Sequence, residues 1–138
     1  GAVAVGEDLR ADDDNGFKTL MGISPQKMTE SLILCGADII GANCGSGFED
    51  MIEIVKRIRE VSDRIPIIIQ ANAGLPVLEN NQLVYSETPD KIKEIIPRLI
   101  DAGANIIGGC CGTTPEHIKV ISGIVKNYNQ NKFVNRNL

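Results

Sequence analysis

Apolar residues occur along this 138-residue chain in two patterns, as short unbroken runs and as stripes that recur every three or four positions. The unbroken runs predict strands that are covered on both faces, because a parallel strand between two layers shows no polar alternation. The stripes predict amphipathic helices. We expect strands at residues 38–42, 65–71 and 105–109, after an initial strand at 1–5.

Helices are predicted between and after these strands. Ser24-Pro25 and Thr88-Pro89 each join a capping hydroxyl to a proline of the first turn, which is a helix start. Gly36 and Gly103 are expected to end two of the helices in a left-handed conformation. The predicted helices cover four ranges, which are 24–35, 48–62, 88–102 and 114–126.

Two ten-residue segments of the chain resemble each other. Gly36–Gly45 aligns without gaps with Gly103–Gly112, 67 residues further on, and Cys44 falls on Cys111. That distance spans two strand–helix units, which is the repeat expected in a closed barrel whose alternate strands are equivalent. A complete barrel needs eight such units, and this chain offers half of them. We therefore predict an α/β fold of parallel β/α units, the C-terminal half of a TIM (β/α)8 barrel.

The remaining segments are polar. Residues 7–16 are acidic and rich in turn formers, which predicts an exposed loop, and residues 77–87 are interpreted as an excursion with a small hairpin. Residues 127–138 are rich in asparagine and are predicted to form a polar tail or linker. The predicted domain organisation is a partial barrel domain over 1–126, followed by that tail.

The candidate chemistry lies in the cysteines. Cys44, Cys110 and Cys111 follow predicted strands within glycine-rich turns, and the carboxyl ends of parallel strands are where such folds hold their active sites. Adjacent cysteines cannot both point into one core, because neighbouring side chains of an extended chain face opposite ways. A set of thiolates suggests zinc, which keeps a fourth position open in catalytic sites. The alternative is that these cysteines are small residues in crowded turns.

Two further residues bear on this site. His117 is a possible fourth ligand, but its place one turn into a helix favours capping or packing. Cys35 is predicted to be a buried core residue, because a free cysteine packs as a small hydrophobe.

Composition narrows the class of protein. The net charge is −4 and no basic stripe is present, which argues against nucleic acid as a partner. No apolar run approaches the roughly 18 residues of a membrane span. The four cysteines do not resemble a secreted disulfide framework, so we expect a reducing compartment, the cytoplasm. The chain does not begin with Met, which leads us to expect a piece of something larger.

Three motifs occur between about Thr19 and Ile121. They are Gly41-Ala-Asn-Cys-Gly45, Asn72-Ala-Gly-Leu-Pro76 and Gly108-Gly-Cys-Cys-Gly-Thr-Thr-Pro-Glu-His117. In order and spacing they resemble the homocysteine S-methyltransferase family, and most nearly the homocysteine-binding domain of its cobalamin-dependent methionine synthase branch.

The resemblance implies a site and a reaction. Cys44, Cys110 and Cys111 would bind zinc, which binds the sulfur of homocysteine, with no catalytic residue beyond these metal ligands. Asn43 and Asn72 would line the same mouth; alternatively they hold their own turns by side-chain–backbone hydrogen bonds. The implied reaction is zinc-dependent methyl transfer to the homocysteine thiol, giving methionine, with methylcobalamin on a corrinoid domain or protein as the methyl donor.

The chain departs from this family in length. We expect the amino-terminal half-barrel of the family to lie outside this sequence, together with the acidic residues that would hold the homocysteine amino group. The missing half or a second copy of this chain is then the expected partner. An alternative function is a non-catalytic half-barrel that binds metal or oligomerises. A third is an unrelated half-barrel that binds a phosphorylated ligand, although Gly108–His117 contains no Lys or Arg.

Overall fold

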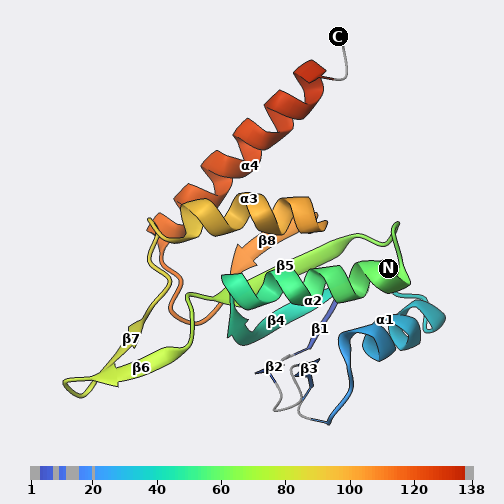
Figure 1. Ribbon diagram of the computed structural model, residues 1–138, viewed down its shortest axis with the longest axis horizontal. Helices are drawn as coiled ribbons and strands as arrows, with labels where there is room; N and C mark the ends of the chain where they lie inside the picture. The colour runs from blue at the N-terminus through green and yellow to red at the C-terminus, as the bar shows by residue number, and fades with distance from the viewer. Residues whose placement is uncertain (1–3, 8–9, 12–15, 20, 136–138) are drawn as a thin grey trace.

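The computed structural model describes residues 4–7, 10–11, 16–19 and 21–135. At its centre lies a sheet whose four strands pair in parallel in the order β1-β4-β5-β8 (Figure 1). These strands are β1 (Ala4–Glu7), β4 (Ile39–Gly47), β5 (Ile67–Asn72) and β8 (Ile106–Gly109). The predicted α/β fold of parallel units is confirmed; of the expected initial strand, residues 1–3 lie outside the described part.

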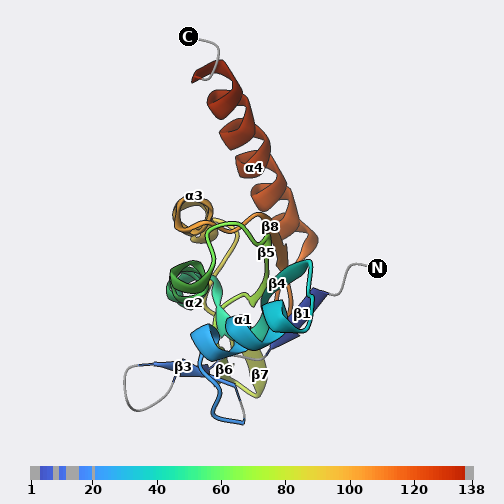
Figure 2. The same ribbon diagram turned by 90° about the vertical axis from the view of Figure 1, so that its right-hand side faces the viewer.

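Four helices alternate with the later strands. They are α1 (Pro25–Leu34), α2 (Phe48–Val61), α3 (Ile92–Ala102) and α4 (Pro115–Asn135). Figures 1 and 2 show α2 and α3 side by side on one face of the sheet, with α1 next to α2 and α4 next to α3. Each glycine expected to end a helix does so, with φ of 81° at Gly36 and 116° at Gly103. Among the described residues, none of the helices combines the length and the apolarity that crossing a membrane requires.

The core lies between the sheet and these helices. Alternate strand residues point towards α2 and α3 and are buried there, together with the apolar stripes of both helices. The strand residues of this core are Ile40, Ala42, Ile67, Ile69 and Ala71. The opposite face is less covered, since Ile68 is half-buried and Ile106 is 42% exposed. The unbroken apolar runs wrongly predicted coverage of both faces by this chain; in a closed barrel that second face is filled by the other strands.

Residues 77–87 contain the predicted hairpin, formed by β6 (Pro76–Glu79) and β7 (Gln82–Tyr85). Asn80 and Asn81 join the strands with φ of 49° and 62°, as a two-residue turn of the left-handed type requires. The hairpin extends from the carboxyl edge of the sheet, away from the helices (Figure 1). Several of its apolar side chains are exposed, among them Leu78 and Leu83.

Three parts of the chain differ from the sequence-based expectation. Within the predicted loop 7–16, β2 (Arg10–Ala11) pairs with β3 (Phe17–Lys18), whereas residues 8–9 and 12–15 lie outside the described part. The helix α3 begins at Ile92 rather than at 88, because a turn comes first, in which Thr88 Oγ1 accepts a hydrogen bond from the Lys91 N–H (3.3 Å).

The last helix is also longer than expected. It runs to Asn135, through most of the predicted polar tail, and projects beyond the rest of the molecule (Figure 1). A polar sequence can remain helical because the backbone hydrogen bonds of a helix lie within it, and no proline interrupts this segment. The proposed domain boundary after residue 126 stays a prediction.

The prediction that Cys35 is buried is wrong. Cys35 is the C-cap of α1 and is exposed, like its neighbour Leu34, of which 87% is exposed. In the last turn of α1, Leu32 packs against the core, whereas Leu34 and Cys35 face away from it, so an apolar residue type there does not imply burial.

Candidate metal centre

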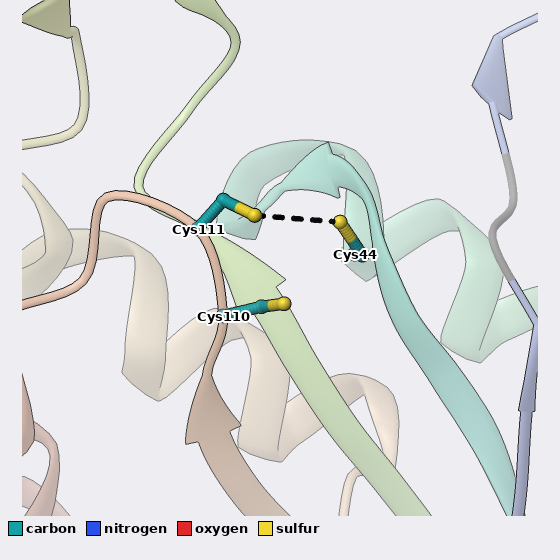
Figure 3. Close-up of side chains that lie close together, drawn as sticks. All are labelled: Cys44, Cys110 and Cys111. Atoms are coloured by element: carbon teal, nitrogen blue, oxygen red, sulfur yellow. Dashed lines mark hydrogen bonds between the residues drawn. The ribbon is translucent and has the colours of Figure 1, made fainter.

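Three cysteine sulfurs converge at the carboxyl edge of the sheet (Figure 3). The Sγ atoms of Cys44, Cys110 and Cys111 all lie within 4.8 Å of one another, and those of Cys44 and Cys111 are 3.8 Å apart. Cys44 comes from β4 and the other two follow β8, with β5 between these strands. The fold thus brings together the three residues that the sequence singled out as metal ligands.

An irregular strand end directs Cys44 towards this point. The pairing of β4 with β5 shifts register between Asn43 and Gly47, so the residues between them leave the regular ladder. Within this bulge Cys44 has a φ of 61° and Gly45 a φ of 72°. A left-handed conformation is uncommon for a residue with a side chain, and such residues concentrate at functional sites. The expected loop at 43–47 is therefore a bulged continuation of the strand.

The turn after β8 is tied to the end of β5. The Cys110 N–H donates to the Ala71 carbonyl (2.7 Å), and the Ala73 N–H donates to the Cys111 carbonyl (2.9 Å). Gly112 then reverses the chain with a φ of 76°, and its lack of a side chain leaves room for the ring of Tyr85. This reversal is why two adjacent cysteines reach one point.

Asn72 lies between the two groups of cysteines. Its side chain is 5% exposed, and Oδ1 accepts a hydrogen bond from the Cys111 N–H (3.1 Å). Its side chain also contributes to lowering the pKa of the Cys44 thiol. Asn72 therefore joins two loops. Asn43 is half-buried, lies opposite Gln70 in the sheet and has no described contact with the cysteines.

The thiols differ in acidity. Burial by itself raises the pKa of Cys44, but hydrogen bonds from the Gly45 backbone, from the other two cysteines and from Asn72 outweigh it, so this pKa is lowered. Burial and the neighbouring Cys44 sulfur raise the pKa of Cys110 to about 11. Several thiolates this close repel one another unless a cation lies between them. Soft sulfur donors in such a set suit zinc, with three protein ligands and one open position.

A cavity of about 460 Å³ opens beside the cysteines, within the usual size of a ligand site. Its described lining comes from the bulge at the end of β4, from the segment that follows β5 and from the turn after β8. The first turn of α2 and the hairpin complete it. The lining residues are Cys44, Gly45, Ser46, Asp50, Asn72, Leu75, Pro76, Tyr85 and Cys111. Asp50 and Tyr85 were not singled out from the sequence. Burial, and then the charge of Glu49, raise the pKa of Asp50.

His117 caps and packs, as one of the two interpretations held. It is 4% exposed, and Nδ1 accepts a hydrogen bond from the Thr114 N–H (3.1 Å) at the start of α4. Nε2 lies 2.8 Å from the carbonyl oxygen of Glu87, to which it donates. Because both ring nitrogens are engaged, His117 is not free to serve as a fourth ligand.

Glu87 was missed entirely. The sequence shows a single acidic residue before Thr88-Pro89, which ordinarily lies on the surface, yet Glu87 is 6% exposed. The residues that make room for Glu87 are glycines distant in the sequence. A Cβ atom at Gly47 would lie 2.7 Å from Glu87 Oε1, and one at Gly74 would lie 3.3 Å from Glu87 Cγ.

The fold and the site together define a protein of parallel β/α units whose strand ends present three thiols. Residues 9–125 match the family model described as homocysteine S-methyltransferase. The chain belongs to the homocysteine S-methyltransferase family, which confirms the resemblance seen in its three motifs.

Two relatives are mycobacterial proteins named methionine synthase. The Mycobacterium leprae protein is 39% identical over 95 residues, which cover 68% of this chain and 8% of that protein. The Mycobacterium tuberculosis protein is 40% identical over 93 residues, which cover 67% of this chain and 8% of that protein. The chain therefore spans about 8% of the length of these relatives.

Solved structures of the homocysteine methyltransferase MmuM from Escherichia coli share the fold. The apo form matches with a TM-score of 0.58 and 21% identity, over 76% of this chain and 34% of that one. The oxidized form matches with a TM-score of 0.62 and 20% identity, over 89% of this chain and 36% of that one. A match to about a third of that chain agrees with the prediction that this chain forms part of a TIM barrel.

Proposed function

We propose that this chain supplies the zinc-binding half of a barrel that transfers a methyl group to the thiol of homocysteine, giving methionine. The observation that carries the proposal is the convergence of three cysteine sulfurs, from two strands, within 4.8 Å. The family and the methionine synthase relatives support the reaction.

The donor set fits zinc on its own chemistry. The pKa of Cys44 is lowered, so this thiol loses its proton more readily than an ordinary cysteine, whereas Cys110 would lose its proton when a cation binds. Zinc held by three thiolates leaves a fourth position for a substrate sulfur and lowers the pKa of a thiol bound there. In the transfer, a sulfur–carbon bond forms, the bond from the methyl group to its donor breaks, and the thiol proton leaves to solvent.

The chain's own residues orient the site. Asn72 holds the Cys111 backbone by a hydrogen bond and lies beside Cys44 in the lining of the cavity. The apolar wall of the cavity, formed by Leu75, Pro76 and Tyr85, lies beside the sulfurs and would exclude water from a bound substrate side chain. We extend the proposal to Asn72 and Asn43 as substrate-lining residues; cavity lining supports Asn72 alone.

Cofactor and partners are part of the same proposal. We propose methylcobalamin on a corrinoid domain or protein as methyl donor, which the motif resemblance to the cobalamin-dependent branch supports. The missing half-barrel or a second copy of this chain would complete the pocket, and the half-covered face of the sheet at Ile68 and Ile106 supports a need for such a partner. A cytoplasmic location follows from the need to keep the thiols reduced.

Zinc content and zinc-edge X-ray absorption test the proposal. The protein is purified without chelator and measured with and without homocysteine. One zinc per chain with three sulfur neighbours, rising to four with homocysteine, is the expected result. Zinc that is bound but unchanged by homocysteine would instead support the alternative, a metal-binding or oligomerising half-barrel. No zinc in the isolated chain or in a chain completed with the other half would overturn both.

A further inference from the structure

Glu87 connects all three loops of the cysteine site without contacting a cysteine. Its carboxylate accepts hydrogen bonds from the first backbone N–H groups of α2, with Oε2 2.7 Å from Phe48 N and Oε1 3.3 Å from Glu49 N. These groups follow the bulge that carries Cys44. The side chain therefore fixes where α2 begins, and through the short segment 45–47 it fixes Cys44.

The backbone of Glu87 holds the other two loops. Its N–H donates to the carbonyl of Ala73 (2.9 Å), directly after Asn72. Its carbonyl accepts the Nε2 proton of His117 (2.8 Å), whose Nδ1 caps α4 directly after the Cys110–Cys111 turn. One buried residue from a fourth segment thus joins the starts of two helices and the end of β5.

The surroundings of Glu87 are shaped around its side chain. Gly47 and Gly74 leave the space that its carboxylate and its Cγ occupy, since a Cβ atom at either position would lie within 3.3 Å of this side chain. Burial raises the pKa of Glu87 despite its two N–H donors, so the charged form is not favoured by its position. A buried carboxylate that is unfavourable in itself is better explained by the geometry it imposes than by the stability it adds.

We propose that Glu87 is a positioning residue that aligns the three cysteine sulfurs for metal binding, through the α2 start, the Ala73 carbonyl and His117. The inference deepens the proposed function and uses zinc as its probe. Removal of the carboxylate should misplace Cys44 relative to Cys110 and Cys111 while leaving the fold in place.

The test compares Glu87→Gln with Thr88→Ala. The glutamine keeps the size of the side chain but has only one acceptor for two N–H groups. Thr88→Ala is the matched control, because it removes a hydrogen bond to a backbone N–H from the neighbouring residue without touching a cysteine loop. Zinc affinity is measured by chelator competition, and the charge-transfer absorption of the Co²⁺-loaded protein reports the arrangement of the sulfurs.

We expect Glu87→Gln to lower zinc affinity about 10- to 100-fold, as the loss of supporting contacts around metal ligands commonly does, and to change the Co²⁺ spectrum. Thr88→Ala should leave both unchanged. If Glu87→Gln binds zinc as tightly as the wild-type chain and with the same spectrum, the positioning role is wrong while the zinc site stands.

A second measurement reads the alignment without metal. In a Cys110→Ser background, diamide takes two electrons and two protons from two thiols and joins Cys44 to Cys111, whose sulfurs are 3.8 Å apart. The rate of this reaction should fall several-fold in Glu87→Gln and should not change in Thr88→Ala. An unchanged rate would overturn the inference even where the isolated chain binds no zinc; circular dichroism confirms that each variant is folded.

Discussion

The two copies of the ten-residue repeat occupy different places in the same sheet. In the first copy, Ile40 and Gly41 lie on the interior strand β4, which pairs with β1 on one side and β5 on the other. In the second, Ile107 and Gly108 lie on β8, which pairs only with β5 among the described strands. Ile40 is fully buried and Ile107 only partly, although both face the same helix layer. Equal sequence thus leads to unequal burial, because burial depends on neighbours.

The two copies of the repeat are nevertheless alike at their last two positions, the cysteine and the glycine near the carboxyl end of each strand. Cys44 and Cys111, its equivalent positions, lie with their sulfurs 3.8 Å apart. Gly45 and Gly112 both have a left-handed conformation, with similar φ values of 72° and 76°. The helix that follows each copy is capped by a side chain, Glu87 for α2 and His117 for α4. The burial of the strand differs between the copies, whereas both strand ends carry a cysteine followed by a left-handed glycine, which is the pattern expected of a site built at strand ends.

The largest expected effect is on zinc binding and comes from replacing a cysteine at one of the two equivalent strand ends. Cys44→Ser and Cys111→Ser each remove one of three thiolates, so we expect zinc affinity to fall more than about 100-fold, beyond the loss caused by supporting residues. Cys35→Ser is the control, because Cys35 is exposed and lies at the end of α1, before the amino end of β4 rather than at the carboxyl edge of the sheet. Zinc per chain is measured by elemental analysis after dialysis. Full retention by the Cys111 variant would rule out the assignment of this ligand.

The next largest effect is on stability, and it should differ between Gly41 and Gly108, the equivalent glycines of the two copies. A Cβ atom at Gly41 would overlap the Ile68 carbonyl group of the adjacent strand, whereas one at Gly108 would lie 3.5 Å from Gln70 Cγ, an ordinary contact. Gly41→Ala should lower the free energy of unfolding by about 3 kcal/mol or more, and Gly108→Ala by less than about 0.5 kcal/mol. Urea denaturation measures both. Equal losses would show that the two strands are equally confined.

A smaller effect should appear at the isoleucines. Ile40→Val removes a methylene group from a fully buried position and should lower the free energy of unfolding by about 1 kcal/mol. Ile107→Val removes the same group from a partly buried position and should have a smaller effect. The two variants are compared by thermal or urea denaturation. A larger loss at Ile107 would contradict the burial difference between the copies.

The smallest effect is the pH dependence of stability that arises from Glu87, the carboxyl group that caps α2. Burial raises the pKa of Glu87 above its ordinary 4.5, with Asp50 raising it further and the two N–H bonds and Lys91 lowering it. The folded state therefore holds the Glu87 proton at pH values where the unfolded chain has released it, so the free energy of unfolding falls as the pH rises above 4.5.

Comparison with Glu87→Gln isolates this contribution. The stability of the metal-free wild-type chain should decline relative to that of the variant as the pH rises from the ordinary value of 4.5 to the raised one. Urea denaturation of both chains across this range measures the difference. A difference that grows in the opposite direction would mean that the carboxylate is stabilised in the folded state.

The local features of the fold could be predicted from local signals. Ser24-Pro25 marks the start of α1, and Gly36 and Gly103 mark helix ends, because these residue types carry their own conformational preferences. The hairpin within residues 77–87 could be predicted for the same reason, because its turn is formed by Asn80 and Asn81, a residue type that adopts positive φ. The end of α4 was not found, because the polarity of residues 127–135 says nothing about their backbone conformation.

Some features of the candidate site could likewise be predicted from the sequence, and others could not. Cys44, Cys110 and Cys111 could be found from the sequence alone, because a repeat with glycines at fixed places puts them at equivalent strand ends. Asn72, found as part of a loop motif, proved to reach across to a different loop, towards Cys111.

Which residues surround the cysteines was decided by tertiary structure. Glu87 is 43 residues from Cys44 and belongs to a segment with no periodic signal, yet it is buried at the start of α2. Cys35 has the residue type of a core position and is exposed, because it faces away from the core at the end of α1. The sequence determined the strands, the turns and the positions of the three candidate cysteines, whose causes are local. Burial and support arise from contacts between distant segments, and those exist only once the sheet has formed.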